Sequence, residues 1–127
     1  MTPASTIRKI LVENIEQIPK LSAEHIHTFF VPPNEKSTVD AIIVIEELTN
    51  DEADYGNGIK FQSKRKAQLS FYYPPDYTGD MASIEKSVED ILLNHRVRCY
   101  SDAGHVLTLD SQNIINTLKF NYIEEEL

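Results

Sequence analysis

Two histidines form the simplest candidate for a metal site. His25 and His27 stand two positions apart, so on a strand both side chains would leave the same face and could share a metal ion. Such a site needs a third convergent ligand, and none is evident from the sequence. We therefore favour a surface or subunit-contact role for both histidines, with metal binding as the alternative.

Acidic side chains offer two further candidates. Glu46 and Glu47 follow an apolar run and could pair as acid and base, but adjacent strand residues point to opposite faces of a sheet. Asp51, Glu52 and Asp54 could chelate calcium, yet they lack the regular spacing and the closing bidentate glutamate of a helix–loop–helix site. We interpret these three residues as part of a solvated acidic loop.

Glycine and cysteine complete the search for chemistry. The YGNG sequence at 55–58 precedes a predicted strand, whereas a phosphate-binding loop precedes a helix, so a tight turn is the favoured interpretation. Cys99 is the only cysteine, and its predicted strand favours a buried structural thiol, although Arg98 beside it could lower the thiol pKa slightly. No serine or histidine has the context of an activated nucleophile. We predict a protein without enzymatic activity, catalytic residues, metal or cofactor.

Composition limits the remaining classes of function. A length of 127 residues fits one domain, 1–127. The formal net charge of −8 opposes sequence-neutral binding of nucleic acid, because such binding depends on Lys and Arg neutralising phosphates. No apolar run approaches the ~18 residues of a membrane-spanning helix, and the N-terminal residues do not resemble a signal peptide. We expect a product that stays in the cytoplasm and does not enter a membrane.

Two amphipathic helices are predicted from the spacing of apolar residues. The first covers 3–18, with Thr2 as its N-cap and Pro3 at its first position. The second begins after Asp80 or Ser83 and stops near 94–95. Their apolar stripes consist of Ile7, Ile10, Leu11, Ile15 and Ile18 in the first helix and Ile84, Val88, Ile91 and Leu92 in the second.

The strands are predicted from β-branched and aromatic runs. Two strands, 26–31 and 41–45, are joined by a turn at 32–37, and the second is apolar throughout, which suggests a central position. A projecting loop at 49–60 leads to a long strand at 62–73, in which buried and polar positions alternate. Strands at 97–100, 105–109 and 116–122 and an acidic tail at 123–127 follow.

This order predicts an α+β fold in a single domain. The sheet should be mixed but mainly antiparallel, with both helices packed on one face, because neither helix can easily bury its stripe otherwise. The expected order is helix, three strands, helix and two strands, with one further strand as an alternative.

The middle of the chain resembles a family of small tail-component proteins of siphophages and prophages of Gram-positive bacteria. The resemblance depends on the order of motifs over most of the chain and not on any single motif. These motifs are FFVPPNEK at 29–36, IIVIEE at 42–47, DYGN at 54–57 and LSFYY at 69–73. Members of this family are similar to phage tail-terminator, or tail-completion, proteins.

The resemblance implies a structural protein of the virion tail, assembled in the cytoplasm of a host bacterium. Its partners would be further copies of itself in a homo-hexameric ring, the tail-tube protein and a head-completion or connector protein, and DNA would pass through without specific binding. The alternatives are another head–tail adaptor or head-completion subunit and, less favoured, a small metal- or ligand-binding enzyme.

An acidic lumen would suit the passage of DNA, because like charges repel. We expect the acidic residues Asp51, Glu52 and Asp54 to face the lumen or solvent. A closed ring needs head-to-tail contacts, for which an aromatic strand and a projecting loop are suitable. The residues expected at the subunit or tail interface are Tyr55, Gly56, Asn57, Lys64, Arg65, Phe71, Tyr72 and Tyr73.

Overall fold

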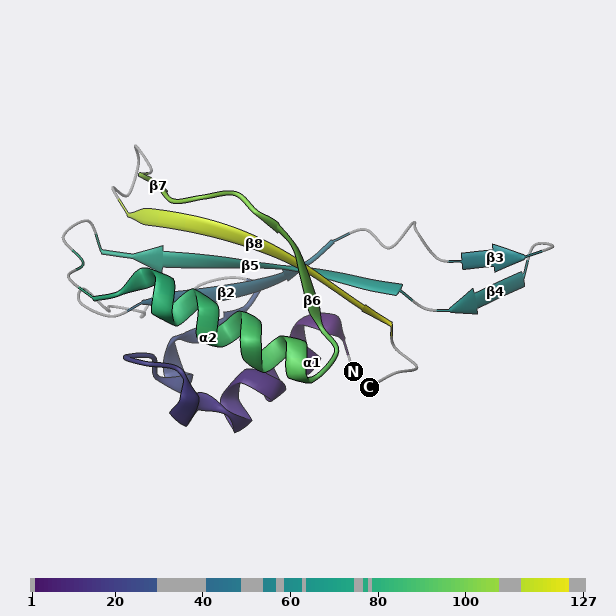
Figure 1. Cartoon of the computed structure of the whole chain (residues 1–127), viewed down its shortest axis with the longest axis horizontal. Coiled ribbons are helices and arrows are strands. Elements are labelled where there is room, and N and C mark those ends of the chain that lie inside the picture. The colour runs from purple at the N-terminus through teal and green to yellow at the C-terminus, as the bar shows by residue number, and fades with distance from the viewer. Residues whose placement is uncertain are drawn as a thin grey trace.

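The protein is a single layer of strands with two helices packed on one side (Figure 1). A computed structural model describes residues 2–29, 41–48, 54–56, 59–62, 64–74, 77, 79–107 and 113–123, and gives only the backbone at 54–56, 59–62 and 64. Neither described helix has the length and apolar composition needed to cross a membrane.

The elements follow the predicted order with an added hairpin, and three strands follow the second helix, as in the alternative with one further strand. The helices are α1 (Pro3–Glu13) and α2 (Met81–Asn94), with short 3₁₀ turns η1 (Ile15–Gln17) and η2 (Ala23–His25). The strands are β1 (Ile26–Thr28), β2 (Ile42–Glu47), β3 (Asp54–Gly56), β4 (Ile59–Gln62), β5 (Lys64–Tyr73), β6 (Arg98–Asp102), β7 (Val106–Leu107) and β8 (Ile114–Ile123). The α+β prediction is confirmed.

Both helices begin at the predicted caps. The Thr2 hydroxyl accepts the Ser5 N–H at 3.2 Å, and Pro3 occupies the first turn of α1. The Asp80 carboxylate accepts the Ser83 N–H at 3.2 Å and the Ser83 hydroxyl at 2.8 Å. These bonds satisfy backbone donors that the first turn leaves unpaired. They also hold the pKa of the exposed Asp80 carboxyl below its ordinary value.

The main sheet has the order β1-β2-β5-β8-β6, with β7 also paired to β8. Strand β5 pairs antiparallel with both β2 and β8, and its register with β8 extends from Lys64 opposite Ile123 to Tyr73 opposite Ile114. Strand β2 is an interior strand, as its apolar sequence predicted.

Strands β1 and β2 are parallel, with Ile26 opposite Ile43 and Thr28 opposite Ile45. A turn joins antiparallel strands only, so the prediction of two strands joined by a turn is wrong. The end of β1 therefore lies beside the end of β2 and not beside its start. The segment 32–37, where the turn was predicted, lies outside the described residues.

The predicted loop at 49–60 contains strand structure. Strands β3 and β4 pair antiparallel, with Tyr55 opposite Lys60 and Gly56 opposite Ile59, and form a separate two-stranded sheet. The prediction of a loop is therefore wrong at 54–56 and 59–60. In Figure 1 this hairpin lies beyond one end of β5, away from both helices.

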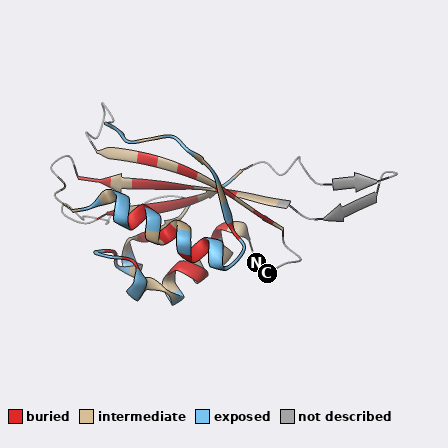
Figure 2. Cartoon of the chain, in the orientation of Figure 1, coloured by how far each residue is buried: buried red, intermediate tan, exposed pale blue. Residues whose placement is uncertain are grey.

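The core lies between the helices and one face of the sheet, here called the covered face (Figure 2). Side chains in β5 alternate as predicted, so that Ala67, Leu69, Phe71 and Tyr73 are fully buried on the covered face. The apolar stripes of α1 and α2 pack against them. The other face, here called the open face, has no helix on it among the described residues.

Candidate functional site

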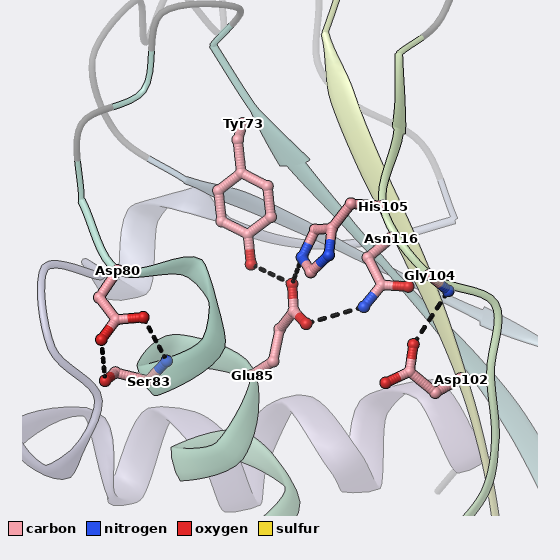
Figure 3. A network of polar contacts seen from close by, with 8 residues as sticks. All are labelled: Tyr73, Asp80, Ser83, Glu85, Asp102, Gly104, His105 and Asn116. Carbon is pink, nitrogen blue, oxygen red and sulfur yellow. Dashed lines mark hydrogen bonds and ion pairs between the residues drawn. The ribbon is translucent and has the colours of Figure 1, made fainter.

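A cluster of polar side chains surrounds Glu85, at the place where α2 lies against β5 and β8 (Figure 3). Glu85 belongs to α2, Tyr73 ends β5, His105 precedes β7 and Asn116 lies in β8. Glu85 and Asn116 are buried, with 6% and 1% of their surface exposed, and His105 lies at the rim with its side chain 36% exposed. Four segments of the chain thus meet at one carboxyl group.

Both oxygens of the Glu85 carboxyl are occupied. The Tyr73 hydroxyl donates to Oε2 over 2.6 Å, and His105 Nε2 lies 2.7 Å from the same oxygen. The Asn116 side-chain amide donates to Oε1 over 2.7 Å. A buried carboxyl group is costly unless such donors replace water. This Glu85 cluster therefore holds α2, β5, β8 and the segment before β7 in one arrangement.

The Tyr73 phenol is fixed in its protonated form. Burial, the hydrogen bond to Glu85 and the charge of Glu85 together raise the pKa of Tyr73 far above its ordinary value. Its ring also packs against Tyr77, with the centroids 5.2 Å apart, and against His105 at 6.1 Å. Tyr73 thus serves as a hydrogen-bond donor and is unsuited to act as a base at neutral pH.

The geometry of the Glu85 cluster favours a positioning role over catalysis. A general acid or base must reach a substrate proton, whereas Glu85 is buried and already accepts hydrogen bonds on both oxygens. Asn116 Oδ1 is buried and lacks a hydrogen-bond partner in the described part of the chain, and one water molecule would satisfy it. No group of three or more side chains able to hold a metal occurs among the described residues.

The two histidines singled out from the sequence do not share a strand. His25 ends η2, whereas His27 is in the middle of β1, so the prediction that both leave one face of a strand is wrong. The three-residue 3₁₀ turn ends at His25, and the extended backbone starts only at Ile26. His25 Nε2 lies 3.8 Å from Glu24 Oε1.

The acidic candidates are also separated. Glu46 pairs with Gln68 on the open face and Glu47 with Ala67 on the covered face, as the alternation of a strand requires. A carboxylate oxygen of Glu47 accepts the Ala4 N–H at 3.4 Å. Asp51 and Glu52 lie outside the described residues, and Asp54 begins β3.

The side chains of Cys99 and Arg98 lie on opposite faces of the sheet. Cys99 faces the covered side, opposite Phe120, whereas Arg98 is opposite Asn121 on the open face. Burial is the main cause that raises the thiol pKa to about 11, and the nearby Glu89 and Asp102 add to the shift. The expectation that Arg98 lowers this pKa is therefore wrong, and the half-buried thiol stays protonated at neutral pH.

The raised pKa predicts slow alkylation of Cys99. Only the thiolate reacts, so the iodoacetamide rate of the folded protein should rise roughly tenfold per pH unit from pH 8 to pH 10. It should level off only near pH 11. The urea-unfolded chain is the control, and its rate should level off near the ordinary thiol pKa of about 8.5. Equal profiles for the folded and unfolded chains would contradict the assignment.

Two of the residues predicted at an interface belong to the core. Phe71 and Tyr73 are fully buried beneath the helices, so the prediction that they contact another subunit is wrong. Their inward direction follows from the alternation of β5. Tyr72 lies between them on the open face, opposite Ile42 and Ile115, and all three of these side chains are half-buried.

The other interface candidates lie near the β3–β4 hairpin. Tyr55 and Gly56 belong to β3, and Lys64 begins β5, but their side chains are outside the described part, as is the whole of Asn57. Arg65 is half-buried and pairs with Tyr122 on the covered side. Arg65 therefore does not share a face with Tyr72.

The open face is apolar at one end and cationic at the other. Its apolar end consists of Ile42, Tyr72, Ile115 and Val106, which follow one another across four strands. The adjacent sheet edge exposes Val106 at 60% and Leu107 at 58%. Val44 and Ser70 in the middle of this face are buried, so the exposed aliphatic side chains lie at its β7 edge, and such an exposed edge is typical of an interaction surface.

Comparison of the sequence with protein-family models and with curated protein sequences gives no match.

Proposed function

We propose that this protein is a structural subunit of a phage tail, of the tail-terminator kind. It assembles with further copies of itself into a homo-hexameric ring that caps the tail tube and joins it to a head-completion or connector protein. The open sheet face carries the proposal, because its apolar end and the exposed β7 edge have no covering element among the described residues. The order of the sequence motifs supports the same class.

The two sides of the sheet are suited to a closed ring. A ring requires two different surfaces on each subunit, one of which binds the other on the next copy. The open face and the helix layer of this fold differ in shape, because both helices lie on one side of the sheet (Figure 1). The Glu85 cluster fixes the segment before β7 and so presents Val106 and Leu107 at a defined place.

The net charge suits a conduit for DNA. A charge of −8 gives a ring a repulsive field toward phosphates, so that DNA can pass without being held. The proposed location is the virion tail, after assembly in the cytoplasm of the host bacterium. The alternative is a head-completion subunit, which would use similar surfaces. Deletion of the gene distinguishes the two functions. Loss of a tail terminator gives overlong tails, whereas loss of a head adaptor gives complete tails beside unjoined heads.

Tyr72 is the first residue to test. The Tyr72→Ser variant should fold normally and self-associate at least about tenfold more weakly, because buried tyrosines commonly dominate protein interfaces. Light scattering of the full chain over a concentration series, with and without purified tail tubes, measures the effect. Tyr72→Phe, which keeps the aromatic ring on the open face, is the control. A wild-type protein that stays monomeric in both conditions, or a Tyr72→Ser variant that assembles normally, would contradict the proposal.

A further inference from the structure

Cations gather at the end of the open face where β8 finishes. Lys66 and Arg98 flank Asn121 in one row across the sheet, and Lys119 lies in the next row, opposite Gln68 and Ser101. Arg98 is exposed, and Lys66 and Lys119 are half-buried. Residues directly opposite one another project from the same face, so the three cations form one surface, here called the cationic end.

The charge of the cationic end contrasts with that of the whole protein. Glu46 is the one anion among the described residues of these two rows, and it is separated from Lys119 by the strand that contains Gln68. The protein as a whole has a net charge of −8. Tyr100 adds an aromatic ring, with Lys66 Nζ 5.8 Å from its centroid. An anionic segment would therefore find both charge complementarity and an apolar contact here.

The chain itself supplies such a segment. Glu124, Glu125, Glu126 and Leu127 follow directly on Ile123, which ends β8 opposite Lys64. We propose that the acidic segment 124–127 of one copy binds the cationic end of the open face on a second copy. This inference names a contact within the assembly and so rests on the proposed function.

Geometry favours binding to a second copy over binding within one chain. Lys119 lies four residues before Ile123 along β8, a distance of about 13 Å at the rise of a strand. To reach it, segment 124–127 would have to reverse its direction, and a β-turn uses about four residues. Within its own chain the segment can reach only the outer row, whereas a segment from a neighbour can approach all three cations.

The same cations suit a nucleic acid less well. A phosphate backbone would extend beyond three cations onto a protein of charge −8, where it would be repelled. A short run of three glutamates carries enough negative charge to pair with the three cations and does not extend onto the surrounding acidic surface. Binding of nucleic acid is therefore the competing outcome of the test.

Charge exchange in the full chain tests the contact. One variant carries Glu124→Lys, Glu125→Lys and Glu126→Lys, and another carries Arg98→Glu and Lys119→Glu. Each should weaken self-association roughly tenfold at low salt, since several exposed ion pairs are lost, and should reduce its salt dependence. The combination of both should restore association to within about threefold of the wild type. The variant Arg98→Lys with Lys119→Arg, which keeps both charges at the same positions, is the control and should have no effect.

A second measurement does not depend on assembly. A synthetic peptide of residues 121–127, added to the Tyr72→Ser variant, should shift the NMR signals of Lys66, Arg98 and Lys119 and should compete with a poly-dT oligonucleotide. No shift at these residues, tighter binding of the oligonucleotide, or no rescue by the charge exchange would each overturn the inference. If wild-type assembly persists in those cases, the proposed function stands; if the peptide binds but the wild type never assembles, the proposed function falls instead.

Discussion

Glu85→Ala is expected to lower the free energy of unfolding by about 2–6 kcal/mol, because each of two buried donors left without its acceptor costs about 1–3 kcal/mol. Alanine would leave the Tyr73 hydroxyl and the Asn116 amide, both buried, without their acceptor. His105 would lose its contact with α2 at the same time. Urea denaturation followed by circular dichroism measures the change.

Glu85→Gln is the matched control for this variant. The amide keeps the volume and one acceptor, so the expected loss is only about 1–2 kcal/mol, in the range of a single hydrogen bond. Equal losses in both variants would show that the lost acceptor and charge, and not the lost volume, decide the effect. A loss below about 1 kcal/mol in Glu85→Ala would contradict the arrangement of the Glu85 cluster.

Phe71→Ala is expected to cost about 3–5 kcal/mol of folding stability, through lost burial and the cavity that remains. Phe71 is fully buried between the sheet and the helices. The neighbouring Tyr72 faces the opposite side and is half-buried. Tyr72→Ala should therefore cost well under half as much, and chemical denaturation of the two variants side by side gives the comparison.

This pair of variants separates stability from assembly. Phe71→Ala should unfold at lower denaturant concentration, yet a folded fraction should still associate through the open face. Tyr72→Ala should remain stable and associate poorly, like Tyr72→Ser. If Tyr72→Ala lowered stability and Phe71→Ala impaired association, Tyr72 would face the core and Phe71 the open face, contrary to the structure.

Much of the fold was predictable because periodicity and capping are local. The alternation in β5 depends on successive side chains leaving opposite faces, and it correctly placed Ala67 and Leu69 inside. The caps at Thr2 and Asp80 follow from short polar side chains that accept backbone N–H groups. These signals require no knowledge of distant parts of the chain.

The Glu85 cluster was missed, although the sequence contains a signal for it. Glu85 lies four residues after Met81 and three before Val88, within the apolar stripe of α2. Asn116 has the same parity in its strand as the buried Leu118 and Phe120. A polar residue at each of two inward positions predicts a hydrogen-bonded pair in the core. His105 gives no such signal, because it lies in an irregular segment.

Pairing between distant strands could not be predicted from local patterns. The parallel direction of β1 and β2 depends on the path between them, and the β3–β4 hairpin was hidden by turn-forming residues. The interface prediction failed at Phe71 and Tyr73 because an aromatic residue fits a core and an interface equally well.

The position of β8 has a consequence for biosynthesis. Strand β8 follows every other described strand in the sequence, yet it lies between β5 and β6 in the sheet. Until residues 114–123 have left the ribosome, one edge of β5 and the whole of β6 lack a partner among the described strands. Contacts so distant in sequence form slowly, and open strand edges promote aggregation. A nascent chain without residues 114–123 therefore cannot display a finished sheet.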